Sequence, residues 1–69
     1  MKFEYRAEIA KFYLAEFGVV EVDANHYDTC IRYQLTRCAP ASLQQIEWFD
    51  NRTDALARFH ELVLQYYVA

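Results

Sequence analysis

The stretch Tyr27-Asp-Thr-Cys-Ile-Arg-Tyr-Gln-Leu-Thr36 decides the fold class, because successive side chains alternate strictly between two sets. The first set is Tyr27, Thr29, Ile31, Tyr33 and Leu35, and the second is Asp28, Cys30, Arg32, Gln34 and Thr36. A period of two is typical of a half-buried β-strand with one face on a core and the other in water. The reactive side chains of this stretch are therefore explained mainly by their place on the solvent face.

The flanking residues predict two further strands. Val19–Asp23 is β-branched and alternates from Val20, and Ala24-Asn-His26 has the composition of a turn. Downstream, residues 37–42 contain the single proline and predict a loop, and Leu43–Phe49 predicts a shorter strand. Because these connections are too short for parallel crossovers, we expect an antiparallel meander.

The amino-terminal residues from Phe3 to Phe17 predict a helix. Their polar stripe is Glu4, Glu8, Lys11 and Ala15, and their apolar arc is Tyr5, Ile9, Phe12, Tyr13, Leu14 and Phe17. Gly18, the single glycine, follows the last of these residues, where a left-handed residue would end a helix. This arc is too wide for one contact with a sheet, so part of it is expected to meet another chain.

A second helix is expected to begin near Asn51. The Asn51 side chain can accept a hydrogen bond from the Asp54 amide, and Asp54 lies in the first turn, where the helix dipole favours a carboxylate. The apolar side of this helix is Leu56, Phe59, Leu62, Val63 and Tyr66. The expected fold is thus α+β, a single domain of residues 1–69 in the order α-β-β-β-α. Two helices cover one face of the three-stranded meander, and its other face is polar.

Composition narrows the function classes. The chain has 69 residues, is 55% hydrophobic and carries a formal charge of −3, so no positive field attracts a phosphate backbone and direct nucleic-acid binding is not expected. No apolar run approaches the roughly 20 residues that span a bilayer, and the amino terminus is interrupted by charges, so we expect a cytoplasmic protein with no membrane association. Two cysteines do not make a disulfide scaffold, although a Cys30–Cys38 bond is the minor alternative.

Catalytic and metal-binding patterns are weak. His26, Cys30, Cys38 and His60 lack the two close ligand pairs of a structural zinc site, so we expect no metal and no cofactor. Catalysis by Cys30 needs a base within reach and oxyanion donors, and no glycine-rich loop is present to supply the donors. The sequence favours a protein that is not an enzyme.

Aromatic residues are the informative excess, at 17% of the chain. Tyrosine, tryptophan and arginine supply most hot-spot energy in protein interfaces, so Tyr5, Tyr13, Arg32 and Trp48 are the candidate anchors for a partner protein. The acidic residues Glu21, Asp23 and Asp28 are candidates for selecting a basic partner and speeding encounter. Mimicry of phosphates by Glu16, Glu21, Asp23 and Asp28 is a further possibility, but a solvated sheet edge explains these residues more simply.

The strand-to-helix junction Ile46-Glu-Trp-Phe-Asp-Asn-Arg-Thr-Asp-Ala-Leu56, together with the small size and acidity, resembles small inhibitors encoded by phages and mobile elements, notably anti-CRISPR proteins. The resemblance implies a non-enzymatic inhibitor that blocks a surface of a larger nuclease complex, a partner with a basic nucleic-acid-binding surface. The resemblance identifies no site residue in this sequence. The alternative is an obligate homodimer, structural or accessory in role, with the first helix as its subunit interface.

Overall fold

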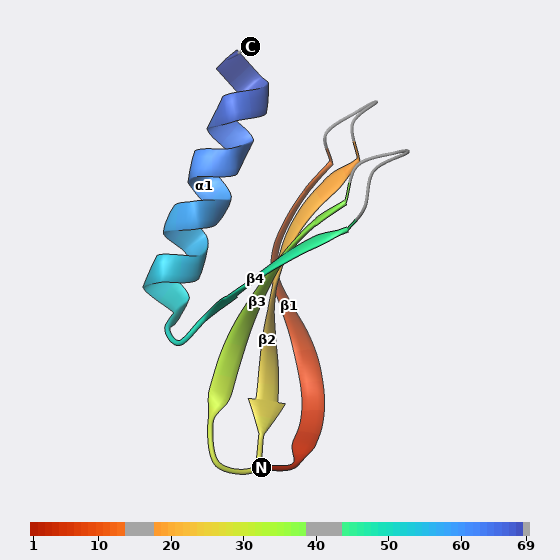
Figure 1. Cartoon of the computed structure of the whole chain (residues 1–69), viewed down its shortest axis with the longest axis vertical. Coiled ribbons are helices and arrows are strands. Elements are labelled where there is room, and N and C mark those ends of the chain that lie inside the picture. Colours follow the sequence, from red (N-terminus) through yellow and green to blue (C-terminus); the bar gives the residue numbers. More distant parts are fainter. Residues whose placement is uncertain (14–17, 39–43, 69) are drawn as a thin grey trace.

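The chain folds as a four-stranded antiparallel sheet with one carboxy-terminal helix. The computed structural model describes residues 1–13, 18–38 and 44–68. Within them, β1 (Phe3–Tyr13), β2 (Val19–Tyr27), β3 (Ile31–Cys38) and β4 (Gln45–Phe49) lie side by side in sequence order, and α1 (Arg52–Val68) follows (Figure 1). The α+β class and the antiparallel meander are as predicted. The helix-first order, the three-stranded sheet and the pair of helices are wrong.

The amino-terminal residues that were predicted as a helix form β1, which pairs with β2 along its whole length. Two register shifts, between Phe3 and Tyr5 and between Glu8 and Ala10, each add one residue to β1. A bulge interrupts the two-residue alternation, and two bulges give the apolar residues of this stretch the spacing of a helix. The predicted helix end at Phe17 lies outside the described residues.

Strand β2 is longer than predicted, because residues 24–26 continue it instead of turning. Asn25 is fully buried in β2 and hydrogen-bonded on both sides. The turn comes later, where the Tyr27 amide donates to the Cys30 carbonyl at 2.8 Å and β3 then begins at Ile31. The strand predicted from Tyr27 is therefore wrong over its first four residues, and Tyr27 ends β2 on the sheet face opposite to that of Leu35. Gly18 has a φ of 113°, a conformation that glycine adopts without strain. It stands at the entry to β2.

The remaining predicted boundaries fall close to the observed ones. Strand β4 begins at Gln45, while Leu43 and residues 39–42 of the predicted loop lie outside the described residues. Helix α1 begins at Arg52 with the predicted cap, since Asn51 Oδ1 accepts from the Asp54 amide at 2.9 Å. Asn51 Nδ2 also donates to Asp54 Oδ2 at 2.9 Å. The two side chains satisfy each other and fix the first turn.

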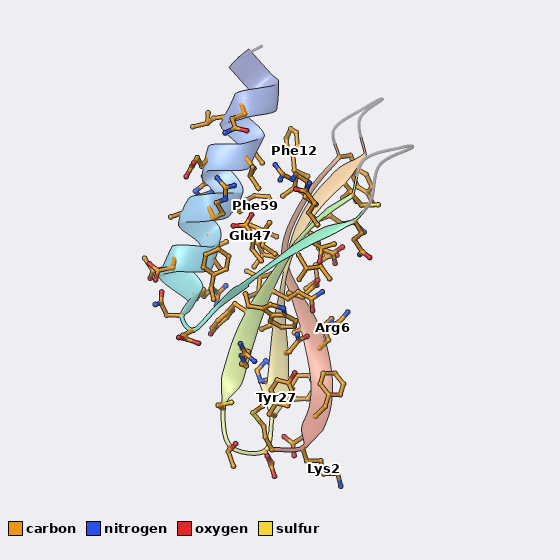
Figure 2. The ribbon with its side chains drawn as sticks, in the orientation of Figure 1. Lys2, Arg6, Phe12, Tyr27, Glu47 and Phe59 are labelled. Carbon is orange, nitrogen blue, oxygen red and sulfur yellow. The ribbon has the colours of Figure 1, made fainter. Side chains whose placement is uncertain are left out.

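The core lies between α1 and one face of the sheet, which we call the helix-side face. Its buried residues are Val20, Val22 and Leu35 from the strands and Ala55, Phe59 and Leu62 from the helix. Tyr33 and Phe49 pack against them, and so does Ile9, the extra residue of the second bulge. Figure 2 shows Phe12, Glu47 and Phe59 on the side of the sheet that α1 occupies. Among the described residues one helix forms the second layer, where two were expected.

The helix covers only part of the helix-side face. The molecule measures 40 × 24 × 15 Å, and α1 runs beside the end of the sheet away from the chain's amino terminus (Figure 1). The end formed by the start of β1, the end of β2 and the start of β3 extends past the first helical turn. There Tyr5 stacks on His26, with 4.2 Å between ring centroids and 9° between ring planes.

Candidate functional site

The sheet face opposite α1, which we call the open face, carries the candidate site. Because residues opposite one another in an antiparallel pair share a face, the strand register assigns its members. Across β1 and β2 the pairs are Tyr13 with Val19, Lys11 with Glu21, Glu8 with Asp23 and Arg6 with Asn25. Across β3 and β4 they are Thr36 with Ile46 and Gln34 with Trp48. All four strands contribute to this surface.

The centre of the open face is a fixed polar chain. Arg6 Nε donates to Asn25 Oδ1 at 2.7 Å, and Asn25 Nδ2 donates to Gln34 Oε1 at 3.0 Å. Gln34 Nε2 then donates to Thr36 Oγ1 at 3.1 Å. Asn25 and Gln34 are buried, and buried polar side chains are held rigidly when their hydrogen bonds are made. This chain crosses three strands and stiffens the middle of the surface.

An acidic group lies beside this chain on β1 and β2. Glu8, Glu21 and Asp23 share the region with one cation, Lys11, whose Nζ is 3.9 Å from Glu8 Oε1. Partial burial raises the pKa of Glu21, and its hydrogen bond to and repulsion by Asp23 raise it further. Tyr13 raises the pKa of Lys11, with smaller contributions from Glu21 and Glu8. Of these three carboxylates, Glu8 is the one that forms an ion pair with Lys11.

Apolar side chains lie toward the margins of the open face. Trp48 is 46% exposed and Ile46 is 45% exposed, both on the edge strand β4. Arg32 lies over the Trp48 ring, with its guanidinium carbon 5.2 Å from the centroid. Tyr13 is exposed at one end of the face, and Phe3 packs edge-on against Tyr27 at the other. A rigid polar centre with exposed rings around it can contact a broad partner surface.

The structure brings five of the seven predicted binding residues to this face. They are Tyr13, Glu21, Asp23, Arg32 and Trp48. Asp23 is buried, so its carboxylate acts on the surface mainly through its neighbours. Tyr5 lies on the opposite face, stacked on His26. Asp28 lies in the β2–β3 turn, where its Oδ1 accepts from the Lys2 amide at 2.8 Å, so it is separate from the acidic group.

Sequence reasoning missed Arg6, Glu8, Lys11 and Ile46 as members of this face. The first three belong to β1, whose residues were assigned to a helix. The high aromatic and β-branched content of residues 3–13 is a strand signal that could have found them. Ile46 could have been found from Trp48, because residues two apart on a strand share a face.

The two thiols lie at opposite ends of β3. Both cysteines are free and exposed. Cys30 immediately precedes β3 and Cys38 ends it, so the two lie eight positions apart along the chain, roughly 25 Å, far more than a disulfide spans. The Cys30 Sγ contacts Met1 Sδ at 3.3 Å. Among residues 1–13, 18–38 and 44–68, no three His, Cys, Asp or Glu side chains come together as a metal site.

Comparison with known protein families, with curated proteins and with solved structures finds no match. Within the described part of the chain, no helix is both long and apolar enough to cross a membrane.

Proposed function

We propose that this protein is a non-enzymatic protein-binding module that acts by occupying a surface of a larger protein. The observation that carries the proposal is the open face, where Trp48, Ile46 and Tyr13 are exposed around a hydrogen-bonded polar centre. Exposed aromatic residues beside arginine are the composition of interface hot spots. A sheet face with its side chains already ordered loses little entropy on binding.

Trp48 and Arg32 form the anchor of the proposed surface. The guanidinium over the indole ring holds both side chains in place before a partner arrives. Ile46 extends the apolar contact along β4, and Tyr13 provides a second contact at the far end of the face. These four side chains would account for most of the binding energy.

The acidic group gives the proposed partner its charge. Glu8, Glu21 and Asp23 carry more negative charge than Lys11 balances. Burial and the neighbouring Asp23 raise the pKa of Glu21, and a partner that places lysine or arginine over this region offsets the repulsion by Asp23. A basic partner surface is thus favoured, in line with the nucleic-acid-binding complex that the resemblance to phage inhibitors implies. Inhibition of such a complex would be steric.

Binding through a sheet edge fits the structure less well than binding through the face. Strand β1 has two bulges, and β4 has only five residues. Bulges and short edge strands are the features with which proteins prevent pairing with other chains. The side chains of the open face, rather than the backbone of an edge, are the proposed contacts.

The test is affinity capture from a bacterial lysate with a matched pair of variants. Ile46→Glu changes the open face, and Ile31→Glu makes the same change at a similarly exposed isoleucine of the helix-side face. We expect one protein to be captured by the wild type and by Ile31→Glu, and to be lost with Ile46→Glu. If the captured protein is a nuclease, it should lose activity in proportion to the amount of chain added. Capture that is equal for both variants, or no specific capture, would contradict the proposal.

A further inference from the structure

Two sulfur atoms meet at the end of the sheet that extends past α1. Cys30, the residue before β3, donates its thiol hydrogen to Met1 Sδ at 3.3 Å. Met1 is the single methionine of the chain, and Cys30 is one of its two cysteines. The two residues are 29 positions apart in sequence, so their contact is a product of the fold. The expectation of no metal rested on histidine and cysteine spacing and left out this thioether.

Hydrogen bonds next to the two sulfurs hold the backbone on both sides of their contact. The Lys2 amide donates to Asp28 Oδ1 at 2.8 Å, and the Asp28 amide donates to the Lys2 carbonyl at 2.9 Å. Phe3 packs edge-on against Tyr27, with 5.7 Å between the ring centroids. Figure 2 shows Lys2 and Tyr27 at this same end of the sheet. The start of β1 is thereby fixed against the β2–β3 turn, which keeps the thioether beside the thiol.

We infer that Cys30 Sγ and Met1 Sδ together bind a Cu(I) ion. Thiolate and thioether sulfurs are soft donors of the kind that select Cu(I). This ion has a filled d shell and accepts two or three ligands. On binding, it replaces the hydrogen of the Cys30 thiol, and the proton passes to water. The copper stays in the Cu(I) state, so no electron is transferred and no oxidant or reductant takes part.

The distance between the sulfurs suits such an ion after a small movement. At metal–sulfur distances of about 2.3 Å, trigonal coordination places two sulfurs roughly 4 Å apart. The 3.3 Å contact therefore has to open by less than about 1 Å. Met1 is 73% exposed and its side chain is unbranched, so it can move this far without disturbing the core. Because Cys30 is exposed as well, the third position on the ion is left to water.

Other metal ions fit these residues less well. Zn²⁺ takes four protein ligands in structural sites and three in catalytic sites. Within the parts of the chain that the structure describes, no three His, Cys, Asp or Glu side chains come together. Mg²⁺ and Ca²⁺ take oxygen ligands, and the nearby Asp28 carboxylate accepts from the Lys2 amide. Cu(I) is the ion that two sulfurs can hold, and holding it requires no partner protein.

The test compares Cys30→Ser with Cys38→Ser. Each variant retains one exposed thiol, but only Cys38→Ser retains the thiol beside Met1. Affinity is measured by competition with a chromogenic Cu(I) chelator, without oxygen, with ascorbate present and with less than one copper per chain. The wild type and Cys38→Ser should bind Cu(I) with similar affinity. Cys30→Ser should bind it at least roughly tenfold more weakly, since even residues that only support a metal ligand change affinity by about 10- to 100-fold. Equal affinities for the two variants would overturn the inference.

Selenomethionine provides a second measurement, because selenium in place of sulfur marks Met1 alone. Mass spectrometry first establishes that the labelled protein retains this residue. X-ray absorption at the selenium edge should then show a copper neighbour at bonding distance in the wild type and in Cys38→Ser, both loaded with Cu(I), and none in Cys30→Ser. Copper bound by the wild type without a neighbour at selenium would overturn the inference. A copper neighbour that persists in Cys30→Ser would also overturn it.

Discussion

Arg58 of α1 holds Glu47 of β4 through its Nε, which lies 3.1 Å and 3.2 Å from the two carboxylate oxygens. Arg58 also donates from Nη1 to Glu61 Oε1 at 2.9 Å, one turn further along the helix. The first contact joins the helix to the edge strand, whereas the second is an exposed pair within the helix. The two glutamates therefore offer a matched comparison around one arginine.

Replacing Glu47 with alanine should lower the free energy of unfolding by about 1 kcal/mol, because a half-buried guanidinium loses the partner that ties α1 to β4. Glu61→Ala should cost no more than a few tenths of a kcal/mol, as exposed helical pairs do. Urea denaturation of both variants measures the difference. Equal losses would show that the Glu47 contact does not stabilise helix docking.

Replacing Asn25 with alanine should lower the free energy of unfolding by about 2 kcal/mol. Asn25 is 1% exposed, and its removal leaves buried Gln34 without its donor and Arg6 without its acceptor. Thr29→Ala, in the exposed turn between β2 and β3, is the control and should have little effect. A loss no larger than that of the control would mean that the polar chain does not hold the strands together.

Replacing Asn51 with alanine should lower the free energy of unfolding by about 1 kcal/mol, because the Asp54 amide then loses its acceptor. Asn51→Ser retains a side-chain oxygen and should recover most of the loss. Thermal unfolding followed by circular dichroism distinguishes the two variants. Equal melting temperatures for the alanine and serine variants would show that the cap is not what fixes the helix start.

Glu21 should make the stability of the protein depend on pH. Because burial and Asp23 raise its pKa above the ordinary value of 4.5, the folded state binds this proton more tightly than the unfolded state does. The resulting destabilisation is present above the raised pKa and is relieved as the pH falls through it toward 4.5.

Glu21→Gln should therefore stabilise the fold at neutral pH, by less than about 1 kcal/mol after solvent screening. The gain should disappear in acid. Glu4→Gln removes the same charge from an exposed site away from Asp23 and should show no such pH-dependent gain. Urea denaturation across a pH series makes the comparison, and a gain that persists below pH 4.5 would be inconsistent with this account.

Elements whose residue pattern is uninterrupted are predicted well from the sequence. Strand β1, whose alternation is interrupted by two bulges, is predicted badly. Ile31, Tyr33 and Leu35 share the helix-side face because β3 keeps its register throughout, and the Asn51 cap depends on neighbours in sequence. The bulges of β1 are set by its pairing with β2, and that pairing cannot be read from the local pattern. Asn25 was placed in a turn for a similar reason, since its two hydrogen-bond partners are distant in sequence.

The residues of the candidate site were likewise predicted well on regular strands and badly on the bulged strand β1. Arg32 and Gln34 were placed on one face by the alternation of a regular strand, and the structure adds Trp48 to it, paired with Gln34 and beneath Arg32. Tyr5 and Tyr13 were expected on one helical arc, but the strand and its bulge put them on opposite faces of the sheet. The binding role of these residues stays a prediction.

Trp48 gives the most direct test of the central claim that the open face is the binding surface. It is the single tryptophan of the chain, so its fluorescence reports on this face alone. Acrylamide quenching is measured for the isolated chain and for its complex with a captured partner, after the fluorescence of the partner alone is subtracted. The account predicts that quenching decreases and the emission shifts to shorter wavelength as the complex forms. Complex formation with unchanged quenching and emission would contradict it.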